Sequence, residues 1–246
     1  MPNAINIDDS GRGPVFRFGT AAFHSADGLV GLGSDALRNS LTRLAALYAG
    51  YAADLKPEVL PTRLLEIEGG PIIAAARTAI EAERAEARTA TEAEANFRNP
   101  VLTVDPAVMV YHWQRFTAMD RAAAAKAIQA ADLEALTALV SRGNKAGLPD
   151  QVYEHAVERY RVLNWVERQQ LAARHPLQPT PERILATGPD TAAAEADARQ
   201  QLAEHAQRLD RIKAAEAGAK DLLRFLAATF AVRPDDMLNR VLGRPA

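Results

Sequence analysis

Cysteine is absent from this chain of 246 residues. Its absence excludes disulfides, thiolate nucleophiles, iron–sulfur clusters and cysteine-based zinc sites. A chain without cysteine is compatible with a reducing compartment. We therefore expect a cytoplasmic protein, or a component of the virion if the chain is of bacteriophage origin.

Long apolar runs and a strong net charge are also missing. No run approaches the roughly 18 apolar residues of a membrane span, and the amino terminus lacks the basic and apolar regions of a secretory signal. The formal net charge of −2 gives no reason to expect attraction of the whole chain to nucleic acid. We expect no membrane partner, and we do not expect nucleic acid as a specific partner.

Aromatic residues make up only 6% of the chain, and the residues that favour strands never cluster beyond a few positions. Alanine accounts for about a fifth of the sequence, and leucine, glutamate and arginine are also abundant. These residues are the better helix formers. The composition predicts an all-α fold, an elongated bundle of about six to eight helices.

One uninterrupted segment, from about residue 190 to 231, dominates the sequence because it contains no proline and a single glycine, Gly218. Its steps alternate four and three residues, as in the a and d positions of a heptad repeat. We call this stripe the seam. It comprises Ala198, Leu202, His205, Leu209, Ile212, Glu216, Ala219, Leu223, Leu226 and Phe230. The pattern predicts one very long C-terminal helix, with any break near Gly218.

Residues 1–33 differ from the rest because they are rich in glycine and show no helical period. Such a segment cannot form a core of its own. One interpretation is a disordered terminus. The other is an extended arm that adds to a neighbouring subunit, with phenylalanines as its anchors. The candidate subunit contacts on the arm and the seam are Phe16, Phe18, Phe23, Leu202, His205, Leu209 and Ile212.

Local signals place the other helix boundaries. Ser34, Asp105 and Asp120 are typical N-cap residues. The run Gly69-Gly70-Pro71 predicts a break between a short helix over 62–68 and a new helix that ends at Arg98, before Asn99-Pro100.

Prolines at 176, 179 and 181 predict a semi-rigid linker. A single short helix is expected inside it, from about Thr180 to Gly188. The predicted organisation is an extended arm (1–33), a helical body (34–175), a proline-rich linker (176–189) and the long helix with a short C-terminal helix (190–246).

Patterns that carry chemistry are few. Residues 31–36 match G-x-G-x-x-A, but no buried strand precedes them, and Asp35 places negative charge where a phosphate would sit. No two of the five histidines lie three or four residues apart, so paired-histidine metal motifs are absent. We predict no catalytic residues, no cofactor, no metal site and no enzymatic activity.

Residues 132–166 can also be interpreted as a helix-turn-helix unit. Its first helix would end at Gly143, and Arg142 and Lys145 would lie in the turn. Acidic residues at the start of the second helix would repel phosphate. The aromatic patch over 109–116 offers another binding surface. These features keep open a cytoplasmic helical binding or regulatory module, such as an adaptor or a nucleic-acid-associated factor.

The long helix, the arm and the linker together favour a non-enzymatic structural or assembly protein. It would act as a homo-oligomer or as a subunit of a larger complex, with further copies of itself and other protein subunits as partners. A bacteriophage connector or ring subunit has this general character. An enzyme whose site converges from distant residues is the third hypothesis.

Overall fold

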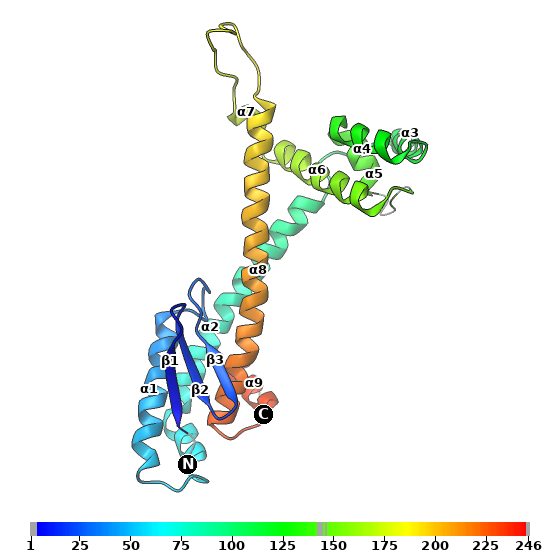
Figure 1. Ribbon diagram of the computed structural model, residues 1–246. Coiled ribbons are helices and arrows are strands. Elements are labelled where there is room, and N and C mark those ends of the chain that lie inside the picture. The colour runs from blue at the N-terminus through cyan, green and yellow to red at the C-terminus, as the bar shows by residue number, and fades with distance from the viewer. Residues whose placement is uncertain (1–3, 142–144, 146, 245–246) are drawn as a thin grey trace. The chain divides into compact units, whose positions relative to one another are not determined.

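A computed structural model describes residues 4–141, 145 and 147–244. Most of these residues are helical, and a small antiparallel sheet precedes the first helix (Figure 1). The elements within the described residues are β1 (Ile5–Asp9), β2 (Pro14–Phe18), β3 (Ala21–His24), α1 (Asp35–Ala52), α2 (Leu60–Arg98), α3 (Pro106–Thr117), α4 (Arg121–Ala130), α5 (Leu133–Ser141), α6 (Asp150–Arg168), α7 (Leu171–Arg174), α8 (Thr191–Thr229) and α9 (Pro234–Leu242).

The mostly helical fold and the very long C-terminal helix are confirmed, whereas the expectation of a chain without strands is wrong. The described residues hold nine helices, where about six to eight were expected. The bundle arrangement stays a prediction. None of the described helices is both long enough and apolar enough to cross a bilayer.

The chain divides into two compact units, which we call the first unit (1–90 and 207–246) and the second unit (91–206). Both α2 and α8 contribute residues to each unit. The segment 176–189 lies inside the second unit, and the expected organisation into arm, body, linker and long helix stays a prediction.

The segment expected to form an extended arm is a folded three-stranded sheet with the order β1-β2-β3. Phe16 lies opposite Phe23 in the antiparallel register. Since side chains alternate along a strand, Phe16 and Phe18 share the buried face, whereas Arg17 lies half-exposed and pairs with Asp8 at 2.8 Å. Gly19, with a φ of 59°, provides the left-handed conformation of the β2–β3 turn.

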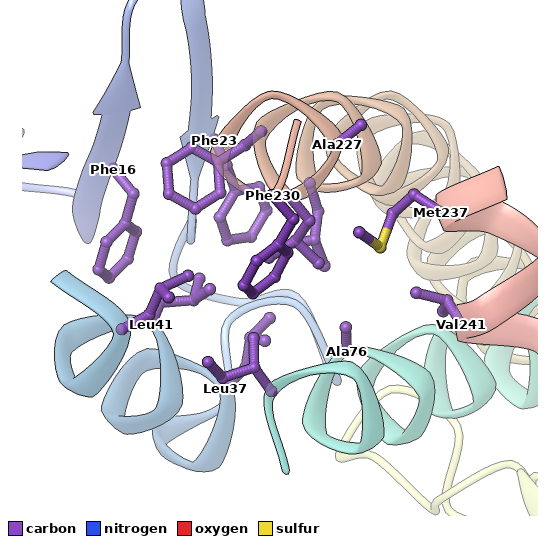
Figure 2. Packing of buried hydrophobic residues seen from close by; sticks show 14 of the residues in the cluster. Phe16, Phe23, Leu37, Leu41, Ala76, Ala227, Phe230, Met237 and Val241 are labelled. Atoms are coloured by element: carbon purple, nitrogen blue, oxygen red, sulfur yellow. The ribbon is translucent and has the colours of Figure 1, made fainter. Parts of the chain in front are cut away.

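The core of the first unit lies between the sheet, α1, the first part of α2, the end of α8 and α9. Side chains from all five converge in Figure 2, where phenylalanines from the sheet meet leucines of α1. The labelled members are Phe16, Phe23, Leu37, Leu41, Ala76, Ala227, Phe230, Met237 and Val241. Phe16, Phe18, Phe23 and Leu32 of the N-terminal segment therefore belong to the core of their own chain.

Helix α2 runs without interruption through the predicted break, with Pro71 inside it. Proline removes one backbone hydrogen bond and usually kinks a helix. The burial of Leu64, Ile72 and Ala76 in the first core supplies tertiary packing on both sides of Pro71. This packing stabilises a continuous helix in spite of the break that Gly69-Gly70-Pro71 predicts.

Helix α8 is continuous from Thr191 to Thr229, and Gly218 lies within it. A Cβ at Gly218 would lie 3.2 Å from Leu32 Cδ1. This glycine therefore permits Leu32 to approach α8 closely, and it does not interrupt the helix. The predicted seam was wrong at Glu216, because Ala215 is buried and Glu216 is exposed, whereas the later seam residues Leu226 and Phe230 are buried as expected. Glu216 instead pairs with Lys220 at 2.6 Å.

The second unit contains the end of α2, the helices α3 to α7 and the start of α8. Helices α3, α4, α5 and α6 enclose one buried cluster, with Phe116, Ile128 and Leu136 at its centre. A smaller cluster joins α6 and α7 to α8 through Val162, Leu171, Ala194 and Ala198.

Candidate interaction sites

The three phenylalanines predicted as arm anchors lie in the core of the first unit. The ring centroids of Phe16 are 6.4 Å from Phe23 and 6.3 Å from Phe225, and Phe18 meets Tyr48 edge-on at 5.2 Å. Phe16 and Phe23 are fully buried. The structure therefore corrects their predicted position on an extended arm, because in this fold they stabilise their own chain.

The four candidate contacts on α8 have different surroundings. Leu202 packs against the small cluster of the second unit, and His205 is buried. Leu209 and Ile212 are half-buried and belong to none of the buried clusters found in the described residues. Leu209 and Ile212 therefore remain candidates for contact with another subunit.

Glu94 is the centre of a polar network in the second unit. Its carboxylate accepts hydrogen bonds from Arg98 at 2.6 Å, Arg161 at 2.8 Å and His205 at 3.0 Å. Burial acts to raise the pKa of Glu94, but the charge of Arg161 and the hydrogen bonds outweigh it and hold this pKa below its ordinary value. The network ties α2, α6 and α8 together.

A second chain of hydrogen bonds links α6, α8 and the segment after α7. Trp165 Nε1 donates to Gln201 at 2.7 Å, Gln201 donates to Asp197 at 2.8 Å, and His175 Nε2 lies 3.0 Å from Asp197. The hydrogen bond from His175 is the main reason why the pKa of Asp197 is lowered. We interpret both networks as structural.

The glycine-rich turn at residues 31–33 binds an acidic side chain of its own chain. The backbone amides of Gly31 and Leu32 donate to Glu83 Oε1 at 2.8 and 3.1 Å. A Cβ at Gly31 would lie 2.0 Å from the carbonyl oxygen of Ala79, so the turn packs directly on α2. A carboxylate fills the place a phosphate would need, which argues against the dinucleotide-binding interpretation.

The described residues contain no group of three or more acidic or histidine side chains arranged to hold a metal ion. The helix-turn-helix interpretation has little support where it can be examined. Lys145 Nζ lies 2.6 Å from Asp150, so its charge is already paired, while Arg142 and Gly143 lie outside the described residues. In the aromatic patch, Phe116 is buried in the second unit.

The proline-rich segment forms an exposed loop with a paired base, and the short helix expected inside it is not formed. Leu177 N donates to the carbonyl of Gly188 at 2.8 Å, and Asp190 N donates to that of His175 at 2.6 Å. Nearer the end of the loop, Thr180 and Arg183 form an isolated bridge. In Figure 1 the loop extends beyond the N-terminal end of α8.

Two large aliphatic side chains lie at the end of this loop, which we call the loop tip (Ile184 and Leu185). Ile184 is 71% exposed and Leu185 is 90% exposed, the two highest values among the large apolar residues described. The sequence holds a signal for the tip, since the two residues are adjacent, lack a helical period and stand between Pro181 and Gly188-Pro189. Because we expected a short helix in this segment, we did not predict an exposed loop tip.

The first unit carries a small apolar pocket of about 210 Å³. Apolar side chains and alanines from β2, α1, α2 and the end of α8 form it. We call it the apolar pocket, lined by Phe18, Tyr48, Ala52, Leu55, Pro57, Leu60, Pro61, Ala228 and Ala231. Pro57, Ala228 and Ala231 are exposed, so the pocket opens to solvent.

Comparison of the chain with protein-family models, curated proteins and solved structures finds no match. Fold and function therefore rest on the residues of this chain alone. Two of its surface features, the loop tip and the apolar pocket, offer apolar contact surface.

Proposed function

We propose that this chain is a non-enzymatic structural or assembly protein that works through contacts with protein subunits, including further copies of itself. The loop tip carries the proposal. Leu185 is 90% exposed on a loop whose base is held by backbone hydrogen bonds. Adjacent exposed apolar side chains form contiguous apolar surface, and such surface is typical of a protein interaction site.

Two further features support the proposal. The apolar pocket offers a concave surface for an aliphatic group, and the half-buried Leu209 and Ile212 add apolar surface on α8. A bacteriophage connector or ring subunit is one assembly of this class, and the protein would then be found in the virion. In any other such assembly we expect it in the cytoplasm.

Sedimentation velocity and light scattering of the purified full chain test this function. One chain has a mass of 26.6 kDa. We expect masses above this value that increase as the protein concentration rises from about 1 to 100 μM, the range of moderate affinities. A mass of one chain throughout that range would contradict self-assembly.

A further inference from the structure

We propose that the loop tip of one copy occupies the apolar pocket of a second copy, so that each copy gives one contact and receives one. This inference rests on the proposed self-assembly and specifies the surfaces that carry it. It joins the most exposed large apolar residues of the second unit to an apolar pocket of the first unit, always between different copies.

The sizes of the two surfaces agree. The pocket has a volume of about 210 Å³, and an apolar cavity of about 150 Å³ is enough to bind benzene. One aliphatic side chain fits such a space fully, with a second at its mouth. Val59, which precedes the pocket residue Leu60 in the sequence, is 50% exposed and offers further apolar surface for the second side chain.

Each of the two surfaces has one acidic and one basic residue next to it in the sequence. Glu182 and Arg183 precede the loop tip, and Lys56 and Glu58 flank Pro57 at the pocket. All four are exposed, and none of them forms an ion pair within the part of the chain that the structure describes. Pairing Glu182 with Lys56 and Arg183 with Glu58 would favour one orientation of the docked loop.

The contact joins two different surfaces, so it is heterologous. A heterologous contact propagates from copy to copy until it closes into a ring or continues as an open chain. A two-residue tip buries much less than the roughly 1,200–2,000 Å² of a standard interface. Self-association through this contact alone should therefore be reversible and dependent on concentration.

The absence of cysteine makes disulfide trapping a clean test, because introduced thiols are the only ones in the chain. One variant carries Leu185→Cys and the other carries Ala228→Cys, at a residue lining the pocket. Mixed under mild oxidation, the two should form a disulfide-linked dimer at least several-fold more abundant than a mixture of Leu185→Cys with the exposed control Ala203→Cys. Each chain carries one thiol, so every cross-link joins two copies.

The second test introduces a charge at the loop tip and measures self-association. Leu185→Asp should weaken self-association at least tenfold, and Thr187→Asp, at an exposed position of the same loop, should leave it unchanged. Leu185 is 90% exposed, so we expect no change in thermal unfolding from its replacement.

The outcomes separate the two proposals. A wild-type chain that stays monomeric contradicts the proposed function. A wild-type oligomer that tolerates Leu185→Asp and gives no excess of the mixed disulfide overturns the docking inference while the proposed function stands. Efficient cross-linking of Leu185→Cys with itself would also overturn it, because the tips would then meet each other.

Discussion

His205 Nε2 lies 3.0 Å from Glu94 Oε2, although the two residues are 111 positions apart in the sequence. His205 is almost fully buried, and its ring lies 4.9 Å from that of Phe97. The presence of His205 in the predicted seam is therefore explained by its hydrogen bond to Glu94 on α2. Both residues belong to the second unit, so their pairing stabilises that unit.

Glu94→Gln should destabilise the second unit by about 1–3 kcal/mol at neutral pH, because Arg161 and Arg98 lose a charged acceptor. The pKa of Glu94 in the folded chain lies below its ordinary value of 4.5. Its contribution to stability is therefore complete above about pH 4.5 and is lost as the pH falls through the lower, folded-state pKa. The variant should lose less stability than wild type on acidification.

Denaturant unfolding from pH 7 to 3, followed by tryptophan fluorescence, measures this effect. Both tryptophans, Trp113 and Trp165, lie in the second unit, so the signal reports on that unit. Glu92→Gln, at an exposed position two residues away on the same helix, is the matched control and should change stability by less than about 0.5 kcal/mol. Parallel pH curves for wild type and Glu94→Gln would contradict the assignment.

Gly31→Ala should strongly destabilise the first unit. The added Cβ would lie 2.0 Å from the carbonyl oxygen of Ala79 and would displace the turn whose amides hold Glu83. Forcing atoms into a packed region costs about 1–3 kcal/mol and sometimes more. Thermal unfolding followed by circular dichroism should show a transition at lower temperature than in wild type.

Gly50→Ala is the control for this change, because Gly50 lies exposed in α1 and an added Cβ there would meet nothing within 4 Å. Alanine is the better helix former by about 0.5–1 kcal/mol, so this variant should be equal to wild type or more stable. Equal stabilities of Gly31→Ala and Gly50→Ala would show that the turn does not pack on α2 as described.

Helix boundaries could be predicted from the sequence where a local interaction sets them. The side chains of Ser34, Asp105 and Asp120 accept hydrogen bonds from amides two or three residues later, as expected of N-caps. The end of α2 at Arg98, before Asn99-Pro100, follows from proline geometry in the same way. These signals act over a few residues and require no knowledge of the tertiary structure.

The features missed by sequence reasoning depend on contacts that are distant in sequence. The sheet is stabilised by Phe16, which stacks on Phe23 and packs on Phe225, about 200 positions away in the sequence. The seam was predicted with a strict heptad, whereas a straight helix drifts by about 20° per heptad. That drift agrees with the burial of Ala215 in place of Glu216, and with the burial of Leu222 and Phe225 beside the predicted seam residue Leu226.

Arg77 provides a further test of packing in the first unit. Its Nε donates to the carbonyl of Val241 at 2.7 Å and its Nη2 to that of Arg240 at 2.9 Å, so the guanidinium binds two carbonyls at the end of α9. Arg77→Lys keeps the charge but loses the two-point geometry of guanidinium.

We expect Arg77→Lys to cost about 1 kcal/mol and to speed amide hydrogen exchange in α9. Arg84→Lys, on the same helix, makes the same chemical change at a residue without a described ion pair, and it should leave α9 unchanged. Equal exchange in the two variants would contradict the role of Arg77 at the end of α9.

Phe16→Ala distinguishes a core strand from an exposed arm. Phe16 is fully buried between the sheet and α8, so its truncation should cost about 3–5 kcal/mol and lower the unfolding temperature of the first unit. Ile7→Ala is the control, because Ile7 lies directly opposite Phe16 in the register but is 43% exposed. Its replacement should cost less than about 1 kcal/mol.

Hydrogen exchange measured by mass spectrometry reads the effect in each unit separately. Phe16→Ala should accelerate exchange in α1 and in the final turns of α8, while the helices α3 to α6 keep wild-type protection. Deletion of residues 1–33 should have the same effect in a stronger form, since it removes Phe16, Phe23 and Leu32 from one core. A deletion variant that keeps wild-type protection in α1 would show that the strands are a dispensable arm.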